Sequence, residues 1–263
     1  MLRIGEVAIG EYDNIATPCR FIAELSNNHN GDFKRAIRLI DAAKAAGADI
    51  VKFQAYTADE LVTLRGDGPA PEPWGSQGWT MRALYEKAAT PLDWFPALFQ
   101  YCRDIGISAF SSVFGLDSLA TLERAACPAY KIARLDNRQG TLIDTVVARC
   151  KPVLVSVDMV DWRSHAEGVW HLYCPPKYPT PLADVRLPRF GYSDKYRAPY
   201  IGLSSHCLDP LLPPLAVARG CEVIEMHFML RDEPSELEAN VSLDEYQFAE
   251  MIQRVRQVEA MLA

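Results

Sequence analysis

Two histidines in the last quarter of the chain, His206 and His227, carry the most readily interpreted chemistry. His206 follows the apolar segment "YIGLSS" (200–205), and His227 lies within "EVIEMHF" (222–228), so each imidazole falls at the end of a predicted strand. At the ends of adjacent strands, two neutral imidazoles could bind one divalent ion. Two nitrogen ligands leave coordination positions open, as a catalytic metal needs if it is to polarise a substrate oxygen.

Cationic and hydroxyl side chains occupy corresponding places in other predicted strands. They are Lys52, Ser112, Lys131, Ser156 and Ser204. Such a set suits phosphate and carboxylate groups. Two carboxylates, Glu24 and Glu225, are candidates for proton transfer or for recognition of a hydroxyl group. From these residues alone we expect metal-assisted carbonyl chemistry on a phosphorylated or carboxylated substrate.

Each of these residues, taken alone, also fits a structural role. A histidine at a strand end is commonly held by a hydrogen bond, and a lysine can extend its ammonium group to solvent. Their convergence favours a site, because an isolated charge inside a packed barrel costs several kcal/mol unless it is paired.

The elements that must position these side chains alternate along the chain. Predicted strands cover 20–25, 49–54, 107–112, 129–133, 152–157, 170–174, 200–205 and 222–228. Segments of helical periodicity cover 32–47, 90–106, 115–126, 140–150, 210–220 and 242–263. Gly47, Gly106 and Gly220 stand where a left-handed residue would end a helix.

Eight strand–helix repeats predict a single α/β domain, residues 1–263, folded as a (β/α)8 TIM barrel. Strand residues two apart share a face, so the polar residues would point inward together. A doubly wound open sheet is the rival, but no G-x-G-x-x-G follows the first strand.

Two connections, 55–89 and 175–198, are too long for plain loops. We expect them above the barrel mouth with a functional role, although their Pro and Gly content is also typical of a flexible insertion.

Composition excludes other classes of protein. Hydrophobic residues make up 49%, charged residues 23%, and the formal net charge is −7, so the basic surface of a nucleic-acid binder is not expected. The chain has no segment typical of a signal peptide or of a transmembrane helix, which predicts a soluble, cytoplasmic protein.

Several motifs resemble one known family. The segment "FIAELSNNHNGDFKRAIRLIDAAKAAGADIVKFQAYTADEL" (21–61) closely resembles the first βαβ unit of the N-acetylneuraminate (sialic acid) synthase family, with its A-E-x-x-x-N-H-x-G signature and K-x-Q. The similarity continues in order through "FSSVF", "PAYKIA", "KPVLVSVDM", "LYCPPKYPTPLADVRL", "GLSSHCLD" and "VIEMHF". It covers nearly the whole chain.

The resemblance implies a barrel enzyme that condenses phosphoenolpyruvate with an aldose, N-acetylmannosamine or a related amino sugar. The products would be a nine-carbon 2-keto-3-deoxy acid and phosphate. A divalent metal, Mn²⁺ with Mg²⁺ or Co²⁺ as alternatives, would be held by His206 and His227. It would polarise the aldehyde, C3 of phosphoenolpyruvate would attack, and water would add at C2 before phosphate leaves. A homodimer is the assembly to be expected.

Roles transfer residue by residue. Phosphoenolpyruvate would be bound by Lys52, Ser112, Lys131, Ser156 and Ser204. The acceptor sugar would meet Gln54 and Tyr178, with Glu24 orienting it and Glu225 activating the water.

The sequence departs from the family pattern at the acceptor side. After the fourth strand, "KIARLD" places Arg134 at a usual serine and Asp136 at a usual glutamate, and in "SELEANVS" Glu238 replaces an aspartate. We therefore add Arg134, Asp136 and Glu238 to the predicted acceptor site. Arg134 and Lys177 would suit a negatively charged acceptor if both face the mouth, and otherwise would form surface ion pairs. The family commonly continues into a C-terminal antifreeze-like domain; because this sequence ends after the last predicted helix, we expect either a truncated chain or an acceptor held without that domain.

These observations support a synthase whose acceptor differs from N-acetylmannosamine. One alternative is a 3-deoxy-ulosonate synthase acting on a phosphorylated aldose. The other is a catalytically inactive, sugar-binding barrel. Its buried charges argue against it, because apolar residues there would be more stable.

Overall fold

The computed structural model describes residues 2–10, 17–158, 167–191 and 200–263. Parallel strands in these residues pair in chain order: β3 (Arg20–Glu24), β4 (Ile50–Ala55), β5 (Ser108–Val113), β6 (Tyr130–Ile132), β7 (Val153–Val157), β8 (Val169–Tyr173), β9 (Gly202–Ser205) and β10 (Val223–Met229). Because β10 pairs with both β9 and β3, the sheet closes on itself. The predicted (β/α)8 barrel is confirmed.

The closure is tight at one residue. A Cβ atom placed on Gly202 of β9 would lie 2.3 Å from the Val223 carbonyl oxygen of β10. Only glycine allows the two backbones to approach this closely.

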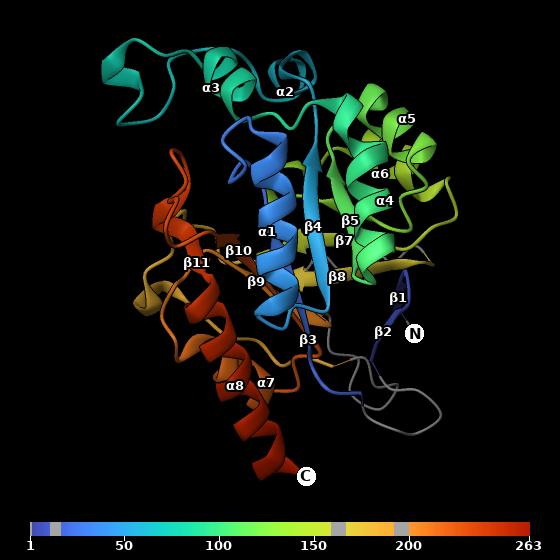
Figure 1. The fold of residues 1–263 in the computed structure, drawn as a ribbon, viewed down its shortest axis with the longest axis vertical. Helices are drawn as coiled ribbons and strands as arrows, with labels where there is room; N and C mark the ends of the chain where they lie inside the picture. Colours follow the sequence, from blue (N-terminus) through green and yellow to red (C-terminus); the bar gives the residue numbers. More distant parts are fainter. Residues whose placement is uncertain (1, 11–16, 159–166, 192–199) are drawn as a thin grey trace.

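Helices cover the outside of the barrel (Figure 1). They are α1 (Phe33–Ala45), α4 (Phe95–Ile105), α5 (Leu116–Arg124), α6 (Gly140–Val147), α7 (Leu212–Ala218) and α8 (Glu245–Leu262). Asp32 begins α1 by accepting hydrogen bonds from the Lys34 and Arg35 amides, and Gly106 ends α4 at φ 72°. No helix of the described residues has the length and apolarity needed to cross a membrane.

The strand–helix repeat is less regular than predicted. In the described residues no α-helix follows β7 or β8, and between β8 and β9 only the short 3-10 helix η4 (Leu182–Asp184) forms. Four prolines between residues 175 and 181 explain this locally, because each removes a backbone donor that a helix needs. Part of the connection, 192–199, lies outside the described residues.

Both ends of the chain contain strands that the sequence analysis missed. An antiparallel hairpin joins β1 (Leu2–Ile4) and β2 (Val7–Ile9). Residues 242–244 form β11 (Ser242–Asp244), which pairs in parallel with the carboxyl end of β10. The last helix therefore begins at Glu245 rather than at 242. Strands of three residues give too short an alternation to be recognised.

The connection 56–89 is folded rather than an extended insertion. It contains α2 (Ala58–Arg65), η1 (Gly75–Gln77) and α3 (Met81–Ala88), which lie beyond the carboxyl end of β4 (Figure 1). Tyr56, Leu61, Tyr85 and Ala88 of this connection form a separate hydrophobic cluster with Phe114, which follows β5. Burial of these side chains holds the connection over the barrel.

Strand register gathers polar residues at one level of the barrel. Glu24 is paired in register with Lys52, Gln54 with Ser112, and Ser204 with Glu225. Two residues before Glu24, Lys52 and Ser112 on the same faces, Ile22, Ile50 and Phe110 are apolar and fully buried. The barrel interior is therefore a packed core capped at its carboxyl end by a polar layer.

Candidate active site

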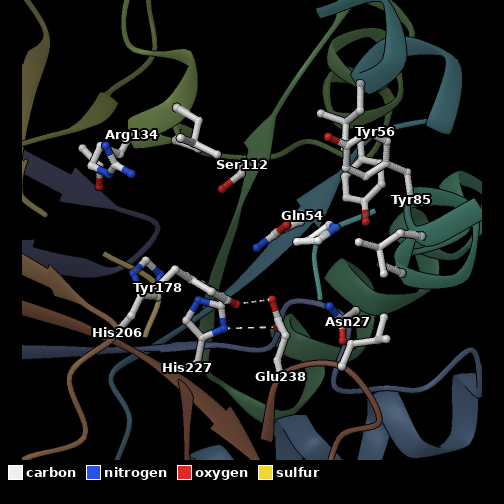
Figure 2. Close-up of a pocket in the computed structure, with 18 of the residues that line it drawn as sticks. Asn27, Gln54, Tyr56, Tyr85, Ser112, Arg134, Tyr178, His206, His227 and Glu238 are labelled. Atoms are coloured by element: carbon white, nitrogen blue, oxygen red, sulfur yellow. Dashed lines mark hydrogen bonds and ion pairs between the residues drawn. The ribbon is translucent and has the colours of Figure 1, made fainter. Parts of the chain in front are cut away.

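A cavity of about 630 Å³ opens above this polar layer (Figure 2). Six strand residues form its base, which we call the strand floor: Lys52, Ser112, Lys131, Ser156, Ser204 and Glu225. Ten residues of the 56–89 connection form one side, which we call the outer wall: Tyr56, Leu61, Arg65, Pro71, Glu72, Pro73, Trp74, Leu84, Tyr85 and Ala88. Active sites of such barrels lie at this end.

Glu225 is the central carboxylate of the strand floor. Its Oε1 accepts a hydrogen bond from the Ser204 hydroxyl at 2.8 Å and lies 3.3 Å from Lys131 Nζ and 3.5 Å from Lys52 Nζ. Burial alone would raise the pKa of Glu225, but the attraction of Lys131 and Lys52 outweighs it and lowers the pKa to about 2. Its Oε2 is buried and has no hydrogen-bond partner among the described residues. One oxygen is thus available to a ligand or a water molecule.

The two floor lysines are both buried, yet they differ in environment. Lys52 is ion-paired with Glu24 and donates to Ser112 Oγ at 3.1 Å, whereas Lys131 donates to Ser156 Oγ at 2.7 Å. Burial opposes the charge of Lys52, but Glu225 and Glu24 raise its pKa above the ordinary value. Burial lowers the pKa of Lys131 even though Glu225 opposes this.

His206 and His227 lie together at the edge of the floor, with ring centroids 5.1 Å apart. Glu238 Oε2 lies 3.2 Å from His227 Nδ1, and the Tyr178 hydroxyl donates to Glu238 Oε1 at 2.6 Å (Figure 2). The Tyr178 ring stands 4.4 Å from the His206 ring. Glu238 therefore fixes the orientation of the His227 imidazole and leaves Nε2 as its other nitrogen.

Electrostatics separate the two imidazoles. Burial, followed by repulsion from His227, lowers the pKa of His206 to about 3, so this ring is neutral at physiological pH. Burial also disfavours charge on His227, but Glu238 raises its pKa above the ordinary value. Burial would raise the pKa of Glu238, yet His227 and Tyr178 bring it to about 2.

The donor set fits a divalent ion. His206 Nδ1 is buried without a hydrogen-bond partner among the described residues, beside a second imidazole that a carboxylate orients. The described residues contain no group of three or more His, Cys, Asp and Glu side chains arranged around one point. An ion at this position would have two protein ligands and would take the others from substrate and water.

Two predicted site residues do not line the cavity. Glu24 is 1% exposed and stands in register with Lys52 and His227; its Oε1 accepts from the Ser26 amide at 2.7 Å, and it pairs with Lys52. Asp136 is fully buried, and its oxygens accept from Arg65 Nε at 3.0 Å and Nη2 at 2.5 Å. Each carboxylate holds a cation of the protein itself, so direct contact of Glu24 or Asp136 with the acceptor stays a prediction.

The remaining predicted residues line the cavity. From the acceptor group these are Gln54, Arg134, Tyr178 and Glu238. Lys177 also lines it, but its Nζ is 2.8 Å from Asp184 and its side chain is 60% exposed, which matches the surface ion pair kept as the alternative.

Sequence reasoning missed the outer wall and one asparagine. Tyr56 could have been found, since it stands two residues after Gln54 on the same face, and Asn27 directly precedes the N-H of the A-E-x-x-x-N-H-x-G signature. Arg65 and Tyr85 carry no such signal, because their place depends on how the connection folds.

Comparisons with known proteins agree with this geometry. The NeuB family model matches residues 39–263. A pseudaminic acid synthase of Campylobacter jejuni is 35% identical over 258 residues, covering 92% of this chain and 74% of that protein. An N,N'-diacetyllegionaminic acid synthase of Legionella pneumophila is 30% identical over 266 residues, covering 93% of this chain and 73% of that protein.

Among solved structures, an N-acetylneuraminic acid synthetase of Leptospira borgpetersenii in complex with citrate superimposes with a TM-score of 0.80. It is 24% identical, and the match covers 100% of this chain and 90% of that one. At this identity the likeness shows the fold.

Proposed function

The chain belongs to the NeuB family, and from this premise we propose how its residues divide the work of a sialic-acid-type synthase. The reaction condenses phosphoenolpyruvate with an aldose to a 2-keto-3-deoxy sugar acid and releases phosphate. The relatives named above make pseudaminic and diacetyllegionaminic acids, so the proposed acceptor is an amino sugar other than N-acetylmannosamine. The observation that carries the division of roles is the buried Glu225 carboxylate, with one oxygen paired and one available.

The floor lysines and serines would bind the anionic groups of phosphoenolpyruvate. Lys52 and Lys131 supply ammonium donors, and Ser112, Ser156 and Ser204 supply hydroxyl groups within the same layer. Charge-assisted hydrogen bonds of this kind are about twice as strong as neutral ones. Phosphoenolpyruvate would thus be held on the floor itself.

Glu225 would act on the water that adds to C2. Its Oε2 can accept a proton while Oε1 stays bonded to Ser204, which keeps the carboxylate oriented. The lysines that lower its pKa also pair with the incoming anion, so substrate binding weakens their hold on Glu225 and makes it a stronger base.

On the acceptor side, Gln54 and Tyr178 would bind sugar hydroxyls, and Glu238 would orient both Tyr178 and His227. Glu24 would act indirectly, by holding Lys52 and, at 3.4 Å, the Gln54 amide. A divalent ion, Mn²⁺ in this proposal, would be held by His206 and His227 and would supply Lewis-acid polarisation of the aldehyde oxygen.

The test is phosphate release from phosphoenolpyruvate with a panel of aldoses, using protein loaded with Mn²⁺, Mg²⁺ or Co²⁺ in parallel. Release with an N-acylated amino sugar, and a nine-carbon product by mass spectrometry, would support the proposal. A seven- or eight-carbon product from a phosphorylated aldose would favour the ulosonate reaction instead. Phosphoenolpyruvate binding without release for any aldehyde would indicate an inactive barrel. Sedimentation in the same buffer would test the predicted homodimer.

A further inference from the structure

Arg134 lies on the rim of the cavity, away from the outer wall. It begins the 3-10 helix η3 (Arg134–Asp136), which follows β6, and its Nη2 donates to the Pro176 carbonyl oxygen at 2.9 Å. Its Nη1 is 3.9 Å from Asp158 Oδ2. Pro176 follows β8 and Asp158 follows β7, so the guanidinium stands over the carboxyl ends of these two strands. Figure 2 shows Arg134 and Gln54 on opposite sides of Ser112.

The turn that carries Arg134 is attached to the strand floor. Asn137 Nδ2 donates to the Ser156 carbonyl oxygen at 3.2 Å, and Ser156 Oγ accepts from Lys131. On the other side of the turn, Asp136 is held by Arg65. Arg134 is thus tied to the end of β7, near Ser156 and across Ser112 from Gln54, while its bond to Pro176 connects it to the segment that follows β8.

The floor has no spare positive charge of its own. Lys52 and Lys131 are balanced by Glu24 and Glu225, with which they form buried ion pairs. A ligand with a carboxylate and a phosphate ester brings roughly two to three negative charges at neutral pH. Since burying unbalanced charge is costly, a further cation is needed near the phosphate.

Arg134 is suited to supply it. Arg65 is engaged by both oxygens of Asp136, and Lys177 by Asp184. Arg134 donates one N–H to the Pro176 carbonyl oxygen. Its Nη1 is 3.9 Å from Asp158 Oδ2, and the Asp158 side chain is 42% exposed. A guanidinium has five N–H donors in a planar fork that matches two phosphate oxygens.

We propose that Arg134 binds the phosphate of phosphoenolpyruvate, and not the acceptor sugar as its position in the sequence had led us to expect. This inference rests on the proposed function, because it takes phosphoenolpyruvate as the ligand of the floor. Arg134 would then be a substrate-binding residue that contacts phosphoenolpyruvate and not the acceptor.

The experiment measures phosphoenolpyruvate binding by calorimetry and the KM of each substrate for the wild type, Arg134→Ala and Arg134→Lys. Loss of charge-assisted hydrogen bonds should weaken phosphoenolpyruvate binding by about 10- to 100-fold in Arg134→Ala and raise its KM in step. The KM for the acceptor should stay within about twofold. Arg134→Lys, which keeps the charge but not the fork, should fall between the two.

Arg138→Ala is the matched control, because it removes the same charge from an exposed position of the same connection. It should bind phosphoenolpyruvate as the wild type does. A raised acceptor KM in Arg134→Ala, or wild-type phosphoenolpyruvate binding in that variant, would overturn the inference. If the wild type itself bound no phosphoenolpyruvate, the proposed function would fail instead, so the two failures are distinguishable.

Discussion

The strand floor and the outer wall enclose the same cavity but are built from different parts of the chain. The floor takes its residues from strands β4, β5, β6, β7, β9 and β10, and its members are polar and bonded to one another. The wall comes from the single connection 56–89, is mainly aromatic and aliphatic, and rests on its own hydrophobic cluster.

The difference separates two tasks. Charges placed on barrel strands are held in fixed geometry by the sheet, which suits the chemistry common to the reaction. A wall made by one connection can change without disturbing the sheet, which suits recognition of the variable substrate. We therefore expect substitutions in the floor to affect turnover and stability, and those in the wall to affect acceptor binding.

The largest effect is expected from Glu225→Gln in the floor. The amide keeps the shape of the side chain but cannot accept a proton from water, so kcat should fall about 10²- to 10⁴-fold. Phosphate release measures it, and phosphoenolpyruvate binding by calorimetry shows that the site survives. Turnover within tenfold of the wild type would mean that Glu225 is not the base. It would also contradict the assignment of the chemical step to the floor.

Lys52→Met should next reveal the floor as a stability element. Removing the ammonium group leaves Glu24, 1% exposed, without its ion-pair partner, which should lower the free energy of unfolding by about 3–5 kcal/mol. Urea titration followed by circular dichroism measures this. Adding Glu24→Gln should restore part of the loss. As a control from the connection 56–89, Arg82→Met breaks only the exposed pairs with Asp59 and Asp67 and should leave unfolding nearly unchanged.

The stability of the segment that ends the wall connection should depend on pH through His29. Its Nδ1 accepts from the Gly31 amide, so Nε2 donates to Thr90 Oγ1 at 3.0 Å, at the far end of the connection. Burial, followed by Arg35, lowers its pKa to about 4. In the unfolded chain His29 binds a proton near pH 6.5, whereas in the folded chain it does so only near pH 4. Its contribution to the free energy of unfolding is therefore complete above pH 6.5 and declines towards pH 4, by about 3 kcal/mol in all.

Unfolding titrations at pH 7, 5.5 and 4 would measure that decline, and His29→Gln should reduce it by roughly half, because His206, with a pKa of about 3, adds a decline over the same range. The floor carboxylate Glu225, with a pKa lowered to about 2, adds a decline only below about pH 5, where the unfolded carboxyl begins to bind a proton, so the step from pH 7 to 5.5 is free of it. An unchanged slope in His29→Gln would assign the acid sensitivity to another part of the molecule.

The smallest effect is expected from Tyr85→Phe in the wall. It removes a hydroxyl group from the cavity lining, and the KM for the acceptor should rise about two- to tenfold. The KM for phosphoenolpyruvate should not change. Ser112→Ala in the floor is the converse variant and should raise the KM for phosphoenolpyruvate alone. Equal effects of either variant on both substrates would erase the distinction between the two regions.

The same two regions differ in how far sequence could predict them. Strand alternation places Lys52 and Gln54 on one face and joins Ser204 to Glu225 across neighbouring strands, so most of the floor could be predicted without coordinates. The barrel followed from the same pattern. Alternation gives the face of a residue but not its partner, which is why the sequence did not indicate that Glu24 pairs with Lys52.

The wall and the rim could not be predicted in this way. The pairing of Asp136 with Arg65 joins residues 71 positions apart in two irregular segments, where no periodicity relates one to the other. Substitution relative to the family drew attention to Asp136, but a changed residue can serve a changed internal contact as readily as a changed ligand. The short strand β11 was hidden by the helix pattern that follows it.

Glu60 joins helix α2 of the wall connection to the barrel helix α5. At the start of α2, its Oε2 accepts from the Thr57 amide, while its Oε1 accepts from the amides of Asp117 and Ser118 at the start of α5. Any local opening of α2 must release these two amides of another helix. Hydrogen exchange at Asp117 and Ser118 should therefore report the opening of the wall from a distance, and a ligand that bridges floor and wall should slow it.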